Sequence, residues 1–302
     1  MPIITSANVT NAIVRLVAAD ALPALMGNLV MGNLVNRDFE PTLAQAGDSV
    51  NVPFPPALTA NNILEGGSVV TQNPSLGNAT IILNAHAEAT FQIPDMTRVL
   101  AYPDLLKMYM QPAVIALAER IEMDLLLLAT QFSANTPVGT ANVALTEATI
   151  DLAETALFNA KVPATSPKYL VVDGTGYSQL RQIARFSEYS TAGEAGLRAL
   201  VDGAVGKIKD FFVLRSQFVP KGGAPVLTSN LAFSKNAIGL VTRRLPQPLP
   251  GTGAIAEYAE MGNFGIRVLM SYAPNTLAQQ FTVDVLYGCA VLRNNQGILV
   301  RS

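Results

Sequence analysis

The clearest pattern along the chain is a strict alternation of apolar and polar side chains. Apolar residues occupy every odd position from Ala79 to Ile93, and a period of two predicts a β-strand. Such a strand would extend over about 50 Å at roughly 3.3 Å per residue, well beyond the usual five or six residues. Residues 47–54 form a shorter alternating strand that stops at two prolines. We expect the two strands to pair across a long connection as a ribbon that needs a neighbouring surface, because a two-stranded ribbon is marginal alone.

A helical period follows from about residue 102 to residue 132, with Pro112 as an expected kink or restart. About 20 residues beyond this proline, at 1.5 Å each, give roughly 30 Å of helix, enough for the spine of a domain. Arg120 and Asp124 stand four residues apart, the spacing of a helical ion pair. The apolar stripe consists of Val114, Leu117, Ala118, Ile121, Leu125 and Leu128. The carboxylates in and before the helix are interpreted as capping and surface residues: Asp95, Asp104, Glu119, Glu122 and Asp124.

The beginning of the chain favours a helix-rich apolar arm over residues 6–35, interrupted by Pro23. Within it, residues 26–30 and 31–35 are a tandem pentapeptide. Its period of five suits neither a helix nor a strand, so we interpret it as a local duplication.

The middle third, from residue 136 to about 263, predicts a separate α/β unit. Thr146 can cap a helix that ends before Pro163. A proline- and glycine-rich loop over residues 246–253 marks the end of the unit. Between them we expect a strand at 169–172, a turn at 173–176 into a helix at 177–186, a short helix at 197–201, a strand at 208–214 and a helix at 233–240.

The last 40 residues predict strands at 266–272, 281–291 and 298–300. These strands need an apolar surface, and the spine helix offers one. We therefore expect the beginning and the end of the chain to share one domain, with the middle third inserted between them.

Composition narrows the class of protein. The net charge is −2 and charged residues are only 14% of the 302, which suggests that other subunits cover part of the surface. The 20 cations are scattered, so we expect contact with DNA to be weak and unspecific. One cysteine and one histidine cannot form a disulfide or a Cys/His zinc site within the chain. Neither a signal peptide nor a membrane helix is expected.

No catalytic site emerges, and we expect neither a cofactor nor a metal. Residues 174–176 resemble a dinucleotide loop, but Gln179 replaces its third glycine, so a tight strand-to-helix turn is the expected structure. His86 lies on the polar face of the long strand, a poor scaffold for a general base, and is expected to be exposed or to face another subunit. Cys289 follows a glycine in an apolar strand and is expected to be a small core residue. A paired-carboxylate site among the acids of the spine region stays open as an alternative.

The order of these elements resembles the major capsid protein of tailed bacteriophages, whose fold is shared by encapsulins and the herpesvirus capsid floor. Short phrases, which are weakly specific one by one, support the resemblance through their order and spacing. They are NLVNRDF at 33–39, GDSV at 47–50, GAVGKI at 203–208, LAFSKNAI at 231–238 and VDVLYG at 283–288.

The resemblance implies an α+β fold in four parts. Residues 1–47 would be an N-terminal arm and residues 48–94 an extended β-hairpin loop. Residues 95–135 and 264–302 would form a peripheral domain with the long spine helix, and residues 136–263 an inserted axial α/β domain. It also implies self-assembly into pentamers and hexamers of an icosahedral shell that encloses double-stranded DNA unspecifically, in a virion capsid assembled in the host cytoplasm. Further implied partners are a portal protein, a separate scaffolding protein and a decoration protein.

Some relatives cross-link a lysine of the extended loop to a neighbour's asparagine. No lysine precedes Lys107 in this chain, so we expect this cross-link to be absent. The residues expected to contact other subunits are Arg37, Asp38, Phe54, Ile63, Glu65, Val69, Ile82, His86, Glu88, Arg98, Arg185, Glu188, Arg243 and Arg244. Two alternatives remain, an encapsulin-like compartment for cargo enzymes and an α/β nucleotide-binding enzyme.

Overall fold

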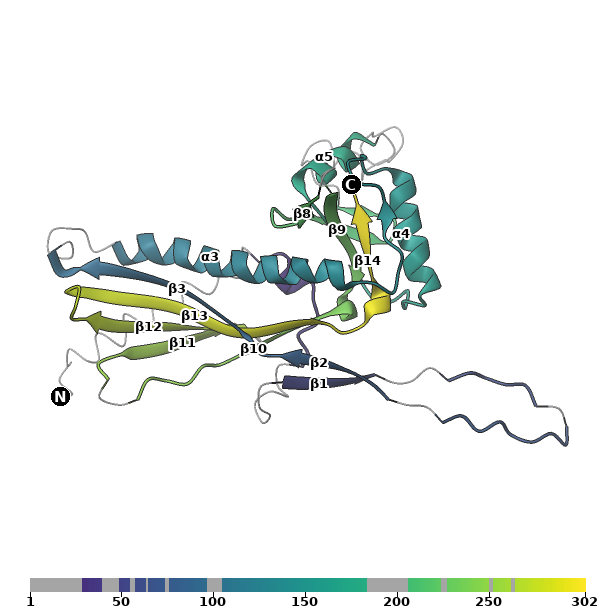
Figure 1. Ribbon diagram of the computed structural model, residues 1–302, viewed down its shortest axis with the longest axis horizontal. Coiled ribbons are helices and arrows are strands. Elements are labelled where there is room, and N and C mark those ends of the chain that lie inside the picture. Colours follow the sequence, from purple (N-terminus) through teal and green to yellow (C-terminus); the bar gives the residue numbers. More distant parts are fainter. Residues whose placement is uncertain are drawn as a thin grey trace, which may run out of the picture.

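The computed structural model has two sheets, a long helix and a projecting ribbon (Figure 1). The expected arm helix before residue 29, the expected helix at 197–201, and Arg98, Arg185 and Glu188 lie outside the residues that the structure describes. It describes residues 29–39, 49–54, 58–63, 65–73, 76–96, 105–183, 206–223, 227–249, 252–261 and 264–302.

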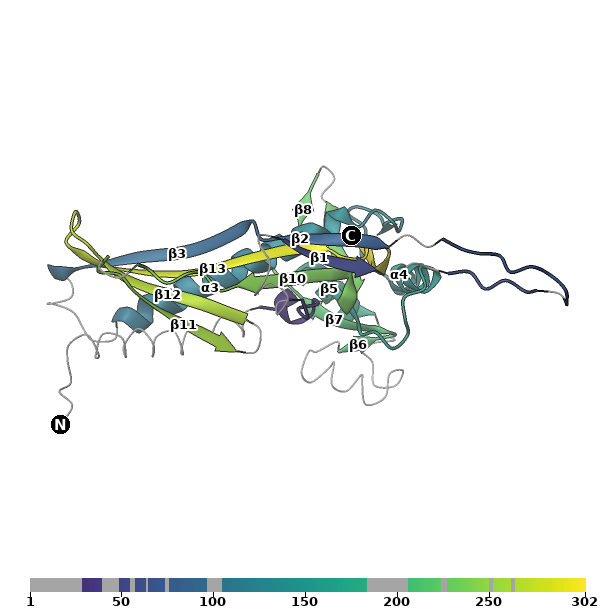
Figure 2. The same ribbon diagram turned by 90° about the horizontal axis from the view of Figure 1, so that it is seen from below.

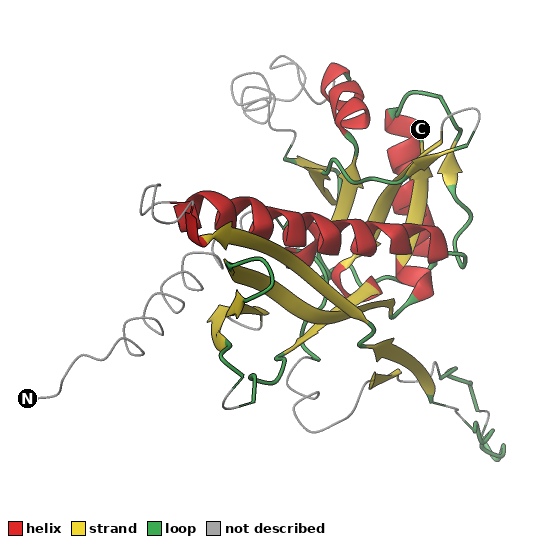
Figure 3. Cartoon of the chain, turned by 60° about the vertical axis from the view of Figure 1, so that its left-hand side comes forward, coloured by secondary structure: helices red, strands yellow, loops and turns green. Residues whose placement is uncertain are grey.

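The first sheet has five antiparallel strands and carries helix α3 (Leu105–Leu127) on one face (Figure 3). Strand β13 is its centre, pairing with β3 along one edge and with β12 and then β10 along the other. β11 pairs with the outer edge of β12. The strands are β3 (Ala85–Pro94), β10 (Ile238–Arg243), β11 (Ile255–Met261), β12 (Phe264–Ala273) and β13 (Ala278–Val291).

Helix α3 lies on this sheet through the apolar stripe predicted from its period. All six stripe residues are buried, and Ile121 and Leu125 are completely covered. The facing positions of β3 are Ala85, Ala87 and Ala89, whose small side chains leave room for the helix. The helix continues through Pro112, and Arg120 and Asp124 form the expected ion pair at 3.3 Å.

The second sheet forms the other unit, with the strand order β4-β14-β9-β5-β7-β6 and β8 paired to β9. Its strands are β4 (Val138–Gly139), β5 (Lys168–Val172), β6 (Lys207–Ile208), β7 (Phe211–Arg215), β8 (Lys221–Gly222), β9 (Leu227–Ser234) and β14 (Gly297–Arg301). Helix α4 (Glu147–Asn159) begins at Thr146, whose hydroxyl accepts the Thr149 N–H, as the expected cap. Helix α5 (Gly174–Gln182) begins at Asp173.

The ribbon is shorter than the sequence pattern predicted. Strands β1 (Ser49–Phe54) and β2 (Gly77–Ile82) pair antiparallel, and the strand is then interrupted at residues 83–84 although the alternation of side chains continues. The expectation that residues 85–94 belong to the ribbon is wrong, because this stretch pairs with β13. β2 and β3 both bury their odd positions, although against different partners, so the alternation alone predicted one continuous strand.

Three further expectations about the middle of the chain are wrong in whole or in part. The expected helix at 233–240 is the end of β9, a short turn, η4 (Lys235–Ala237), and the start of β10. The expected strand at 208–214 is confirmed over residues 211–214, which lie in β7, but Ile208 belongs to the separate strand β6 that pairs with it. The unit expected over residues 136–263 does not hold together, because β10 and β11 pair in the five-stranded sheet, while β14 pairs in the seven-stranded sheet. Periodicity cannot distinguish a short apolar run in a strand from one in a helix, and it does not identify the partner strand.

Within the described ranges the chain crosses between the two sheets three times at one place. The crossings are the short turns η3 (Leu128–Gln131), η4 and η5 (Asn294–Gln296). The Asn294 side chain accepts the N–H groups of Ser133 and Ala134 and so joins the η3 and η5 crossings. Gly297 is close to the Phe132 ring, where a Cβ would lie 2.4 Å from a ring carbon.

Candidate subunit interface

The ribbon projects away from both sheets (Figures 1 and 2). Beyond Phe54 and Gly77 the described residues of the loop, 58–63, 65–73 and 76, form no strand; we call them the ribbon tip. The Thr59 backbone and the Gln72 side chain exchange hydrogen bonds across it. The large apolar side chains of the tip are exposed, and that of Val69 is 77% exposed. They are Leu58, Ile63, Val69, Val70 and Leu76.

The root of the ribbon is anchored in the molecule. Val50, Val52 and Ile81 are buried and pack against Val241 of β10 and Leu292. Apolar burial therefore fixes the point from which the tip projects.

Two glycines make room for the ribbon where it crosses the five-stranded sheet. A Cβ at Gly288 would lie 2.2 Å from the Ile82 carbonyl oxygen, and one at Gly239 would lie 2.8 Å from the Ile81 side chain. At Gly288 the obstacle is backbone, so only a residue without a side chain allows β2 and β13 to approach so closely.

The outward face of helix α3 carries large exposed apolar side chains together with the charged Glu119 and Arg120. Exposed side chains on this face include Met108, Met123 and Leu127, whereas the half-exposed Tyr109 ring packs against the Phe91 ring of β3. Large apolar side chains gathered on an exposed face often mark a contact surface. The outward face of α3 is therefore a second candidate contact surface.

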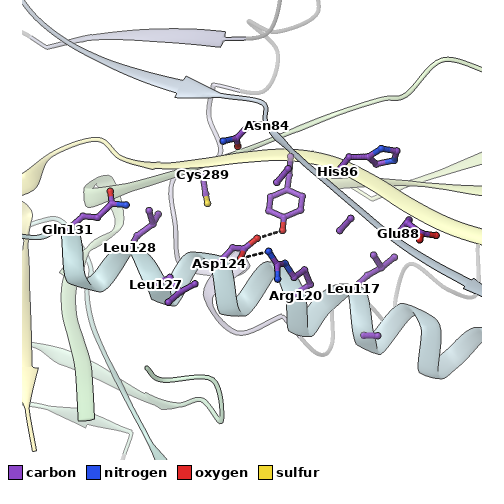
Figure 4. Close-up of a pocket in the computed structure, with 14 residues that line it drawn as sticks. Asn84, His86, Glu88, Leu117, Arg120, Asp124, Leu127, Leu128, Gln131 and Cys289 are labelled. Atoms are coloured by element: carbon purple, nitrogen blue, oxygen red, sulfur yellow. Dashed lines mark hydrogen bonds and ion pairs between the residues drawn. The ribbon is translucent and has the colours of Figure 1, made fainter. Parts of the chain in front are cut away.

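A cavity of about 830 Å³ lies between α3 and the start of β3, beside the ribbon root (Figure 4). The fully buried Tyr287 donates its hydroxyl to Asp124 at 2.5 Å, and Arg120 pairs with the same carboxylate. Burial and this hydrogen bond both raise the pKa of Tyr287. Cys289 lines the same cavity and packs against the core, and burial raises the pKa of its thiol to about 11. A tyrosine and a thiol that both stay protonated offer no nucleophile.

The opposite face of the five-stranded sheet holds a buried carboxylate. Asp284 is 3% exposed, and each of its two carboxylate oxygens accepts a hydrogen bond from the Arg267 guanidinium. His86 lies 3.1 Å from the same carboxylate on the exposed face of β3. Arg267 also donates to the Pro246 carbonyl oxygen at 2.6 Å. This cluster fastens the loop after β10 to the sheet.

Glu122 is the expectation that fails most clearly among the acids. It was interpreted as a surface residue, but it is 1% exposed. Its oxygens accept the Met31 N–H at 2.8 Å and the Ser216 hydroxyl at 3.1 Å. No local signal in the sequence indicates this burial, because both partners of the carboxyl are far away along the chain.

The predicted contact residues fall into groups. Ile63, Glu65 and Val69 lie together on the ribbon tip, and Phe54 and Ile82 at the root, where the Arg293 guanidinium lies over the Phe54 ring. His86 and Glu88 share the exposed face of β3. Arg243 and Arg244 follow one another at the end of β10, and Arg244 lies over the Tyr258 ring. Arg37 is half-buried and Asp38 exposed after the short turn η1 (Met31–Asn33).

The ribbon brings its own five residues together, but the others are spread over three surfaces. The sequence analysis missed the outward apolar residues of α3, because it identified only the regular stripe that is buried against the sheet. For Met108 the signal was the near absence of charged residues from Leu105 to Ala118, where only Lys107 is charged; Met123 and Leu127 lie in a charged part of the helix and gave no such signal.

The turn at residues 174–176 is the expected strand-to-helix connection. The Asp173 carboxylate caps α5 by accepting the Gly176 N–H at 2.7 Å and pairs with Lys221 at 2.8 Å. Burial favours a raised pKa, but these partners together hold the pKa of Asp173 below its usual value. Among the described residues no group of three His, Cys, Asp or Glu side chains is placed to hold a metal ion. No helix in the same part of the chain is long and apolar enough to span a membrane.

Comparison with known proteins shows the fold. No protein-family model and no curated protein sequence matches the chain. A structure of Mycobacterium phage Che8 is similar with a TM-score of 0.65 and 18% identity, over 90% of each chain. The capsid of Ralstonia phage GP4 is similar with a TM-score of 0.61 and 12% identity, over 85% of this chain and 84% of the other. A virus-like particle from Pyrococcus furiosus has a TM-score of 0.51 and 11% identity, over 94% and 97%. The chain therefore has the α+β fold of phage major capsid proteins, as the sequence predicted.

Proposed function

We propose, from the phage major capsid fold of this chain, that it is the structural subunit of an icosahedral phage capsid and not an enzyme. In this proposal, copies assemble into pentamers and hexamers and enclose double-stranded DNA, without covalent cross-links through the extended loop. The seven-stranded unit would serve as the axial domain, and the five-stranded sheet with α3 as the peripheral domain.

The ribbon tip carries the proposal. Its five large apolar side chains are exposed on a segment that neither sheet covers. Full burial of one such side chain stabilises by about 1.5–3 kcal/mol, so covering the tip on another copy would contribute several kcal/mol per subunit. Multiplied around a closed shell, contacts of this size give a stable particle.

The contact would be heterologous. A tip that contacts the same tip of another copy closes a dimer, whereas a ring of five or six copies needs contacts between two different surfaces. The outward face of α3 supplies a surface of matching character, with Met123 and Leu127 exposed. Charge is consistent with this pairing. Glu65 is the only charged residue between Leu58 and Leu76, and the Arg120 side chain on α3 is 61% exposed.

Other proposed partners follow from the same assembly. A separate scaffolding protein would direct shell closure, a portal protein would occupy one vertex, and a decoration protein would bind the outside. Assembly would take place in the host cytoplasm, and the mature chain would reside in the virion. The absence of any lysine before Lys107 supports a shell without loop cross-links. Boiled particles should therefore migrate as monomers on a denaturing gel, and a ladder of covalent oligomers would contradict this.

Electron microscopy of particles from the cells that naturally make the chain tests the whole proposal. We expect closed shells of several hundred Å that protect DNA from nuclease. Shells that contain proteins and no DNA would instead favour an encapsulin-like compartment, which the similarity to the Pyrococcus furiosus particle keeps as the second candidate. A chain that forms no shells would refute both functions.

A matched pair of variants tests the ribbon tip. Val69→Asp removes an exposed apolar side chain and adds a charge that a buried contact would have to desolvate. Asn61→Asp adds the same charge to the same exposed segment without loss of apolar surface. We expect Val69→Asp to reduce particle yield at least about tenfold and to leave the melting temperature of the unassembled chain unchanged. Asn61→Asp should assemble nearly as well as the wild type. Equal particle yields for both variants would refute the role of the tip.

A further inference from the structure

Glu122 is a buried acid at the meeting point of three segments. It lies on α3, and its oxygens accept hydrogen bonds from the backbone of residues 29–36 and from the hydroxyl of Ser216, which follows β7. We call residues 29–36 the docked segment. Leu29, Met31 and Val35 of this segment belong to the core that α3 helps to form. A single carboxyl thus joins the docked segment, the long helix and the seven-stranded unit.

No cation compensates the charge of Glu122 within the described residues. Its carboxyl is bonded by the backbone N–H groups of Met31 and Val30 and by the Ser216 hydroxyl, none of which is charged. Two charged groups line the adjoining cavity of about 510 Å³, Glu119 on the same helix and Arg215 on β7. The Arg215 guanidinium lies over the Tyr177 ring. The docked segment and residues 216–219 contain no titratable side chain.

Burial without a counter-ion makes the ionised form of this carboxyl costly. Desolvation is the largest influence and raises the pKa of Glu122, while the hydrogen bonds from Met31 and Ser216 lower it by less. If the docked segment lifts away, water reaches the carboxyl and removes the cost of ionisation. The closed junction is therefore favoured at acid pH, and it loses stability as pH rises from the usual glutamate range towards the raised pKa.

We propose that Glu122 is an acid latch, whose protonated form holds the docked segment against α3 and whose ionised form favours release of that segment. The latch is independent of the proposed capsid function, because it operates within one chain. Glutamine at this position would keep the latch closed at every pH. Its carbonyl oxygen can accept the Met31 N–H, and its amide can donate to the Ser216 hydroxyl, which can rotate to accept.

Hydrogen–deuterium exchange of the docked segment in the purified full chain tests the latch. The rate ratio between wild type and Glu122→Gln, taken at the same pH, cancels the intrinsic pH dependence of amide exchange. We expect this ratio to rise at least about threefold between pH 4.5 and pH 8.5, since each unit of raised pKa corresponds to a tenfold change in the opening equilibrium. Glu119→Gln, one turn away on an exposed position, should follow the wild type.

A ratio that stays flat or falls with pH would overturn the latch. Ser216→Ala gives a second test that does not depend on the glutamine variant folding. It removes a hydrogen bond that lowers the pKa of Glu122, so the rise in exchange should extend to higher pH than in the wild type. A purely structural role of Ser216 would increase exchange equally at all pH values, and that result would also refute the proposal.

Discussion

Gly288→Ala is the sharpest test of how the ribbon is held at its root. The added Cβ would lie 2.2 Å from the Ile82 carbonyl oxygen and 2.8 Å from the Ile82 carbonyl carbon. Both atoms are backbone, so a side-chain rotation cannot relieve the clash. Strand β2 would have to move by roughly 1 Å, and overpacking of this kind costs about 1–3 kcal/mol. We expect a melting temperature lower by a few degrees, measured by calorimetry on the unassembled chain.

Gly174→Ala is the matched control, because a Cβ there meets nothing within 4 Å. It lies in the first turn of α5, where alanine should be neutral or slightly stabilising. Displacement of β2 should also change where the ribbon tip points, so we expect Gly288→Ala to lower particle yield beyond what its stability loss explains. Equal melting temperatures for Gly288→Ala and wild type would refute the close approach of β2 to β13.

Three further predictions concern stability and reactivity. The Cys289 thiol, whose pKa is about 11, should react with a thiol reagent at pH 8 far more slowly in the folded chain than in urea; equal rates would contradict its burial. The pKa of Asp173 is held below its usual value, so its stabilising contribution is present above the usual aspartate range and is lost as pH falls through the lowered pKa. Urea titrations should therefore show Asp173→Asn less stable than wild type at pH 7, with a difference that shrinks in acid. Leu125→Ala should cost about 2–5 kcal/mol of unfolding free energy, whereas Leu127→Ala, on the outward face, should cost far less; similar losses would show that α3 faces the sheet differently.

The sequence predicted best those elements whose pattern depends on one buried face. The α3 stripe was correct because a period of 3.6 kept over four turns has no alternative explanation. The Thr146 cap was correct because a hydroxyl before an amphipathic helix satisfies an N–H that would otherwise lack a partner. Both signals are local, so the chain itself carries them.

The failures concern partners that only the folded chain brings together. Residues 85–94 alternate as a ribbon strand would, and only pairing with β13 decides their sheet. Residues 233–240 are apolar enough for either a helix or a strand, and β14 and β13 decide for strands. For the candidate interface, the pairing of β1 with β2 was predicted, but the length argument rested on residues 79–93, of which 85–93 belong to the five-stranded sheet. The role of Glu122 could not be predicted, since its acceptor role depends on Met31, which is 91 residues away.

The three crossings at η3, η4 and η5 set a mechanical constraint on the molecule. Two structural units joined by a single chain segment can rotate relative to one another, but three covalent connections at one place must bend together. Torque applied to one unit is thus transmitted to the other through Ser133, Asn294 and the contact of Gly297 with Phe132. In the proposed assembly, a change in the angle between neighbouring copies would be taken up mainly by the ribbon, because the three connections hold the two sheets at a fixed angle.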